Sequence, residues 1–325
     1  MSRSIAVALA FVTVVACGGK SKSSPTSTPI QPEMLWPLDR ILPLFPDGAQ
    51  VILEIDLKRL RTNPIVGPLV IAALNGGASD KLPGSFASEP IANADALVLA
   101  AYGVGTGKAA TVIVLATTAT VPNGVPLGDG LVALGPTEWT GQLEARAAIA
   151  GVTNGDAPKI VASKELLELR DHALPPKAPG ASFRLTARLP FDARVELARE
   201  LNLDTVPAEL SIWADVVDDF AVIIDANAAD PGDKAPKAAA KRLDRAMRAM
   251  LLGLQAEPAV KLLGLAPAID HAKLTATSSW LRTVIVVGPD RLGRVVGRAK
   301  SLLPAKGDRP LNQVQPEPPK PPPPA

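Results

Sequence analysis

The sequence predicts an α+β protein of mostly antiparallel strands, with helices packed on one face and two related units along the chain. Apolar runs rich in β-branched residues follow one another in pairs joined by short turns, which is typical of hairpins. Segments with helical periodicity separate these pairs. One pattern, a short strand that leads through Gly-Pro into a helix, occurs twice. These three observations favour a duplicated architecture.

The first unit covers residues 34–160. Pro64 and Pro68 interrupt its first helical stretch, because proline cannot continue a helix from within. A glycine-rich turn from Gly103 to Lys108 joins the two strands of its hairpin. We expect, in order, a strand over 50–56, helical pieces over 57–74, a hairpin of 96–102 and 109–117, a strand over 131–134 and a helix over 137–150.

The second unit covers residues 161–303. Its first helix is amphipathic, with Phe191, Val195 and Ala198 on one face. Its last helix is expected to be capped by Asp290. We expect, in order, a strand over 182–189, a helix over 191–201, a hairpin of 210–216 and 220–226, a helix over 237–255, a hairpin of 271–277 and 282–287 and a helix ending near 303.

The repeat is most specific where a strand ends. Residues 132–136 read Val-Ala-Leu-Gly-Pro before a helix, and residues 286–289 read Val-Val-Gly-Pro before the last helix. We therefore interpret the chain as two copies of a unit in which a strand, a helix and a hairpin are followed by a further strand and helix, the second copy enlarged by the helix over 237–255.

The start of the chain has the features of a signal peptide. Arg3 precedes an uncharged apolar run from Ile5 to Cys17, which is too short to span a bilayer. Cys17 is the single cysteine, and the segment from Val14 to Cys17 resembles the lipobox of bacterial lipoproteins, with valine at 14 where that family usually has leucine. The resemblance implies thioether lipidation of Cys17, cleavage before it and acylation of the new amino terminus. The alternative is an ordinary secretory signal in which Cys17 has no role.

The resemblance also implies a place in the cell. Residues 1–16 are the expected signal peptide, 17–33 a lipidated flexible tether and 304–325 a disordered proline-rich tail. The partner is a membrane, reached through the lipid anchor. Gly18 stands where an aspartate retains many lipoproteins at the inner membrane, which favours the outer one. We expect a cell-envelope protein facing the periplasm or the cell surface. The layout resembles uncharacterised envelope lipoproteins with a duplicated α+β core.

Composition argues against several kinds of site. The chain has 34 Lys and Arg against 32 Asp and Glu, and 3% aromatic residues, which argues against nucleic-acid binding. Acylated Cys17 would leave no thiol for catalysis or metal binding. His172 and His271 lie far apart in sequence and end ordinary elements. We assign no catalytic residue, expect no cofactor and expect no metal.

Two suggestive motifs are better explained by turns. The segment from Gly103 to Lys108 resembles a phosphate-binding loop, but it joins two predicted strands and continues into Ala109, which has no hydroxyl. Asp215, Asp218 and Asp219 lack the spacing of a calcium loop, and aspartates are common in turns.

Two helices carry basic residues opposite an apolar stripe. One interpretation is a solvated face over the core. The other is contact with anionic lipid headgroups, which an acyl chain on Cys17 would bring close. The residues expected to make that contact are Lys241, Arg245, Arg248, Arg291, Arg294 and Arg298.

The sequence therefore favours a non-enzymatic, lipid-anchored envelope protein that acts as a scaffold, an accessory subunit or a binder of an apolar ligand. Two alternatives remain: a periplasmic hydrolase with dispersed acidic residues, and a carrier of lipid or lipoprotein. A polar cleft with converging carboxylates would favour the hydrolase. A deep apolar pocket under the sheet would favour the carrier.

Overall fold

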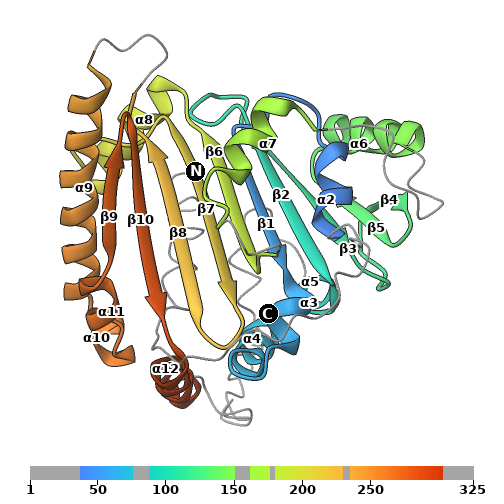
Figure 1. Ribbon diagram of the computed structural model, residues 1–325. Helices are drawn as coiled ribbons and strands as arrows, with labels where there is room; N and C mark the ends of the chain where they lie inside the picture. Colours follow the sequence, from blue (N-terminus) through green and yellow to red (C-terminus); the bar gives the residue numbers. More distant parts are fainter. Residues whose placement is uncertain (1–36, 76–87, 151–161, 176–179, 230–234, 303–325) are drawn as a thin grey trace, which may run out of the picture.

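The computed structural model describes residues 37–75, 88–150, 162–175, 180–229 and 235–302. Within them one continuous ten-stranded sheet has the order β4-β5-β3-β2-β1-β6-β7-β8-β10-β9 (Figure 1). Every neighbouring pair is antiparallel. The strands are β1 (Val51–Asp56), β2 (Ala96–Tyr102), β3 (Ala110–Ala116), β4 (Val125–Gly128), β5 (Leu131–Leu134), β6 (Phe183–Arg188), β7 (Glu209–Val216), β8 (Phe220–Asn227), β9 (Lys273–Thr277) and β10 (Trp280–Val287).

The helices lie between and beside these strands. They are α2 (Pro37–Ile41), the 3-10 helix η1 (Leu42–Leu44), α3 (Leu57–Thr62), α4 (Gly67–Asn75), α5 (Ser88–Asn93), α6 (Thr137–Ala150), α7 (Lys164–Asp171), α8 (Phe191–Leu201), α9 (Pro236–Ala256), α10 (Pro258–Leu263), α11 (Ala266–Asp270) and α12 (Pro289–Leu302). The α+β class and the antiparallel pairing are confirmed. The predictions missed α2, η1, α5, β4, α7, α10 and α11, most of which are short.

The two halves of the sheet have the same strand order. β1 and β6 pair at the centre, and the first to fifth strands of each half run outward from them as β1-β2-β3-β5-β4 and β6-β7-β8-β10-β9. Both Gly-Pro exits are present, from β5 into α6 and from β10 into α12. The pairing of β1 with β6 joins what the sequence suggests are two units into a single sheet.

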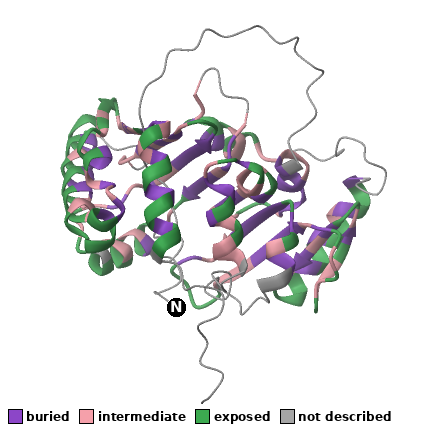
Figure 2. Cartoon of the chain, turned by 90° about the horizontal axis from the view of Figure 1, so that it is seen from below, coloured by how far each residue is buried: buried purple, intermediate pink, exposed green. Residues whose placement is uncertain are grey.

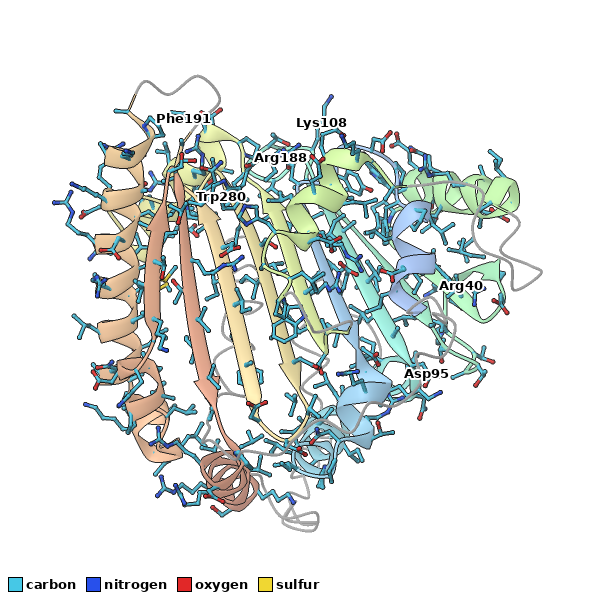
Figure 3. All side chains as sticks on the ribbon, in the orientation of Figure 1. Arg40, Asp95, Lys108, Arg188, Phe191 and Trp280 are labelled. Atoms are coloured by element: carbon cyan, nitrogen blue, oxygen red, sulfur yellow. The ribbon has the colours of Figure 1, made fainter. Side chains whose placement is uncertain are left out.

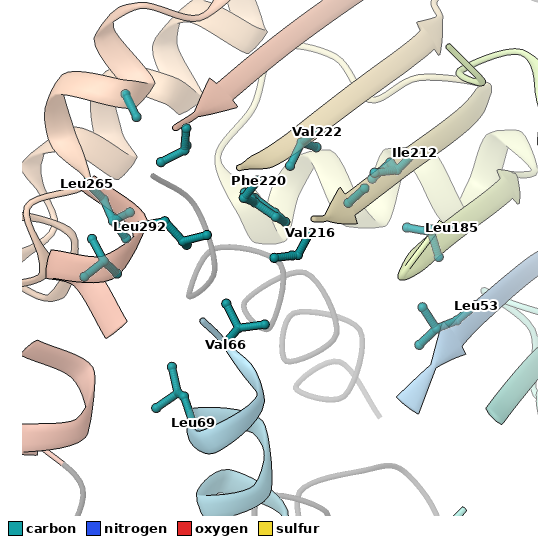
Figure 4. Close-up of a cluster of buried hydrophobic side chains, with 14 of the residues drawn as sticks. Leu53, Val66, Leu69, Leu185, Ile212, Val216, Phe220, Val222, Leu265 and Leu292 are labelled. Atoms are coloured by element: carbon teal, nitrogen blue, oxygen red, sulfur yellow. The ribbon is translucent and has the colours of Figure 1, made fainter. Parts of the chain in front are cut away.

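Side chains alternate between two faces of the sheet. We call the side that carries Leu53, Leu97 and Ile113 the apolar face. Figure 4 shows its core, where Phe220 and Val222 of β8 lie near Val66 just before α4, Leu265 between α10 and α11, and Leu292 of α12. In Figure 2 the strands are largely buried and the outer sides of the helices are exposed.

The opposite face is also covered, which corrects the expectation that all helices share one face. Leu38 of α2, Leu42 of η1 and Leu143 of α6 pack there against Val98 and Val114. The physical reason is visible in β2, which is apolar at every position from Ala96 to Tyr102 except for the tyrosine hydroxyl. A strand of this kind needs cover on both faces.

Helix α8 corrects a second expectation. Its predicted apolar side faces water, with Phe191 66% and Val195 54% exposed (Figure 3). The helix buries Ala193 instead, against the β2–β3 turn. Gly105 in that turn has φ +79°, and a Cβ there would lie 2.9 Å from the Cβ of Ala193. Small residues therefore decide which side of α8 packs.

The start of α12 is a third correction. The helix begins at Pro289, so Asp290 lies inside its first turn rather than at the cap. The carbonyl of Gly288 accepts from the amides of Arg291 and Leu292, at 3.2 and 3.1 Å. Proline suits the first helical position because its missing N–H has no partner there in any case.

Candidate functional site: a basic helical layer

Positive charge is concentrated in the last quarter of the described chain. Residues 236–302 contain twelve lysines and arginines against four aspartates and glutamates. The rest of the chain has 22 basic residues against 28 acidic ones. The nearly balanced total therefore hides a strong separation of charge along the sequence, and α9, α10 and α12 carry most of the excess.

Helix α9 sorts its residues by polarity. Leu243, Met247 and Leu251 are buried in the core of the apolar face. Lys241, Arg245 and Arg248 are exposed. The outward direction expected for these three residues is confirmed. The side chain of Arg248 donates to Asp244 one turn earlier, at 3.0 and 3.1 Å, so part of its charge is neutralised locally.

Helix α12 is arranged in the same way. Leu292, Val295, Val296 and Ala299 are buried. Arg294 and Arg298 are exposed, whereas Arg291 is half-buried. The Arg298 guanidinium donates to the Leu262 carbonyl near the end of α10, at 3.5 Å. Among the described residues, neither Arg245 nor Arg294 makes an ion pair.

Helix α10 contacts both α9 and α12. We call the outward sides of these three helices the basic layer. Two large apolar side chains are exposed within it, Leu252 at 63% and Leu262 at 57%. The basic layer therefore exposes large apolar side chains together with arginines.

The opposite face of the sheet holds a different kind of charge, buried and paired. Glu54 of β1 is 1% exposed and Arg170 of α7 is 7% exposed. The guanidinium donates to both Glu54 oxygens, at 2.7 and 2.6 Å, and to Asp39 at 2.7 Å. Arg184 of β6 pairs with Asp171 at 3.2 Å. These two ion pairs attach α7 to the central strands β1 and β6.

Two further pairs continue this network. Arg59 donates to both oxygens of Asp215, at 2.8 and 2.6 Å, and the Ser182 hydroxyl donates to the same carboxylate at 2.7 Å. The hydrogen bond to Asp215 raises the pKa of Arg59. Asp215 therefore belongs to a strand and a buried pair, not to the turn where the sequence interpretation placed it with Asp218 and Asp219.

His172 takes part in the second pair. Its Nδ1 lies 2.7 Å from Asp225, which also accepts from Arg282 at 2.8 and 2.5 Å. Its ring stacks on Trp280 with 3.7 Å between centroids. Sequence reasoning treated His172 as an ordinary element end and missed these contacts. A signal for these contacts was present in the sequence: Asp225 is a charged residue at a buried position of a strand, as are Glu54 and Arg184, and such a residue needs a partner.

The buried carboxylates of this network are paired. Glu54, Asp215 and Asp225 are each held by an arginine, so none is a free carboxylate in a cleft. In the described ranges, no three His, Cys, Asp or Glu residues are grouped to hold a metal ion. The segment from Gly103 to Lys108 is the hairpin turn between β2 and β3, closed by Thr106 donating to the Gly103 carbonyl.

The lipidation residue and the two tails lie outside the described residues. Cys17, residues 18–33 and residues 304–325 therefore stay predictions. Over the part of the chain that is described, no helix has the length and apolar character needed to cross a membrane.

Comparisons with known proteins assign no family. No protein family matches the sequence, and no curated protein matches it. Among solved structures, crystal form I of the protein TP0453 is similar with a TM-score of 0.37 and 9% identity, over 79% of this chain and 96% of that one. A likeness at this level carries no argument about function.

Proposed function

We propose that this protein is a non-enzymatic, lipid-anchored component of the cell envelope that rests its basic layer against an anionic membrane surface. In this proposal Cys17 supplies the anchor and the envelope is the compartment. The protein acts through its surfaces as a scaffold or accessory subunit.

One observation carries the proposal: Arg245 of α9 and Arg294 of α12 are exposed and make no ion pair in the described chain, on two helices that both contact α10, in a segment with a large excess of positive charge. An anionic surface attracts each such residue by about 1 kcal/mol when it lies within a Debye length. In this proposal the lipid on Cys17 holds the protein at the membrane, and the basic layer orients it against the anionic surface.

The alternatives receive less support. The apolar face is packed with helix side chains over the described residues, which favours action at a surface over a lipid carrier. The buried carboxylates hold arginines, which favours a structural role for them over general acid–base catalysis in a hydrolase.

The anchor is tested with Cys17→Ala in cells. We expect loss of lipid labelling and release of the protein into the soluble envelope fraction. A variant that stays membrane-bound with unchanged mass would contradict the lipid anchor.

The basic layer is tested with residues 17–325 carrying Cys17→Ala, which have neither the signal peptide nor the lipid, and vesicles of neutral or anionic lipid. We expect salt-sensitive binding to the anionic vesicles only. Changing Arg245, Arg294 and Arg298 to glutamine should weaken it by about tenfold or more, because three surface attractions are lost.

A matched control removes three exposed basic residues elsewhere, as Lys108→Gln, Arg188→Gln and Arg199→Gln. Lys108 and Arg188 lie at the end of the sheet away from α12 (Figure 3). The control should bind as the parent does. If both triple variants lost the same binding affinity, the affinity would depend on net charge and not on the basic layer, which would contradict the proposal. Negligible binding of the parent protein to both vesicle types would also refute it.

A further inference from the structure

A small cavity lies on the opposite face of the sheet, beneath α7. Its volume is about 170 Å³. Paired residues Ile52 and Thr186 of β1 and β6 form its floor, and Leu166 and Leu169 of α7 form its roof. Phe45, just after η1, adds an apolar wall. A cavity of about 150 Å³ accepts a benzene ring, so this one has room for a compact apolar group.

Hydrogen bonds from side chains outside the cavity hold its walls in place. The Tyr102 hydroxyl donates to the Pro46 carbonyl at 2.9 Å, and Arg146 donates to the Pro43 carbonyl at 3.0 Å. At the inner end, Arg170 follows Leu169 in the chain and is clamped by Glu54. Because sheet, loop and roof are fixed separately, the space is preformed.

Three residues that line this space carry hydrogen-bond donors. Thr186 is 3% exposed, and its hydroxyl has no partner among the described residues. The Gln50 carbonyl oxygen accepts from the amide of Val104, which leaves the Gln50 amide group free to donate. Arg188 binds Glu209 through Nε at 3.1 Å, and its two terminal amino groups have no partner in the described chain.

The position of these groups sets the ligand's polarity. The Arg188 side chain is 55% exposed, so it lies at the mouth rather than on the floor. Asp47, also at the mouth, is exposed and would oppose an anion. Guanidinium groups bind carboxylates through paired charge-assisted hydrogen bonds. A hydroxyl and an amide add neutral donors.

We propose that this cavity is a binding site for a small monocarboxylate with a compact apolar body. The carboxylate meets Arg188 and the Thr186 hydroxyl, and the apolar body lies between Phe45, Leu166 and Leu169. The inference is independent of the basic layer, which lies on other elements.

The test titrates the full-length protein with benzoate, followed by saturation-transfer NMR and calorimetry, with benzyl alcohol as the neutral isostere. We expect saturable benzoate binding with Kd on the order of 1 mM, as suits so small a ligand, and clearly weaker binding of the alcohol. Arg188→Gln and Thr186→Val should each weaken benzoate binding, the former by about tenfold. Asp47→Asn should strengthen it.

Leu166→Trp fills the cavity from its half-buried roof and should abolish binding. Arg199→Gln, an exposed arginine on α8, is the matched control and should bind as the parent does. Circular dichroism and thermal unfolding check that each variant is folded, and the near-isosteric Thr186→Val keeps the test valid if Leu166→Trp does not fold. Absence of saturable binding up to about 10 mM, ten times the expected Kd, equal binding of the alcohol, or insensitivity to Arg188→Gln and Thr186→Val overturns the proposal.

Discussion

Glu54 and Arg170 form a deeply buried ion pair, with side chains that are 1% and 6% exposed. Removing Glu54 leaves the buried Arg170 charge to rely on Asp39, a carboxylate that is 34% exposed and compensates it less well. We expect Glu54→Gln to lower the free energy of unfolding by about 3 kcal/mol, measured by urea denaturation. A loss below about 1 kcal/mol, the size of an exposed pair, would contradict this.

The double variant Glu54→Leu with Arg170→Met is the control. It replaces both charges by apolar groups of similar size, which is often close to neutral in a core. We expect it to recover most of the stability lost in Glu54→Gln. The double variant also removes the Arg170 partner of Asp39. Because the Asp39 side chain is 34% exposed, water can solvate its carboxylate instead.

Tyr102 provides a pH probe, because it is the only tyrosine in the chain. Burial is the largest cause that raises its pKa above the ordinary value of about 10. The unfolded chain therefore ionises first, and the stability that depends on the neutral phenol is lost as pH rises past about 10. We expect phenolate absorbance to appear only with unfolding, and Tyr102→Phe to show a weaker fall in stability above that pH. Phenolate absorbance at pH 10 in folded protein would contradict this.

Thr283 carries a buried hydroxyl that lacks a hydrogen-bond partner in the described structure, and the residue is 0% exposed. It lies in β10 between Ile224 and Leu274 of the neighbouring strands. Thr283→Val keeps the shape and removes the unsatisfied group. We expect stabilisation by about 1 kcal/mol in thermal or urea unfolding. Destabilisation would mean that the hydroxyl finds a partner in solution.

At the scale of the element, α8 shows that an amphipathic pattern does not by itself decide which side is buried. We expect Phe191→Ser and Val195→Ser each to change stability by no more than about 0.5 kcal/mol, as at other exposed positions. Ala193→Val is the contrasting variant on the packed side. It should cost about 1–3 kcal/mol, because the β2–β3 turn leaves no room for added methyl groups. The reverse ranking would restore the sequence-based interpretation.

At the scale of the whole molecule, the two halves share one core. Leu53 and Leu97 of the first half belong to the same buried cluster as Ile212, Phe220 and Leu292 of the second. The β1–β6 pairing and α7 also cross the boundary. We therefore expect a single cooperative unfolding unit rather than two domains.

Hydrogen exchange in increasing denaturant checks this expectation in one unmodified protein. Amides of β2 and of β8 should report the same free energy of opening, because neither half can lose its core alone. A clearly lower value for one strand would indicate that one half unfolds independently.

The sequence by itself determined much of the local structure. The ends of α6 and α8 agree with the predicted helices at 137–150 and 191–201, and β2 agrees with the run at 96–102. The outward direction of Arg245 and Arg294 also followed from periodicity. These features depend on neighbours within a few turns, where side-chain period, proline and glycine act directly.

Only the tertiary structure decided how these elements combine. It paired β1 with β6, placed helices on both faces and left Phe191 in water. It also built the buried pairs and the cavity beneath α7, neither of which the sequence predicted. Arg170 and Glu54 are 116 positions apart, and Arg59 and Asp215 are 156 apart. Contacts at such separations leave no local periodicity, because they arise from strand register and the competition for buried surface across the whole sheet.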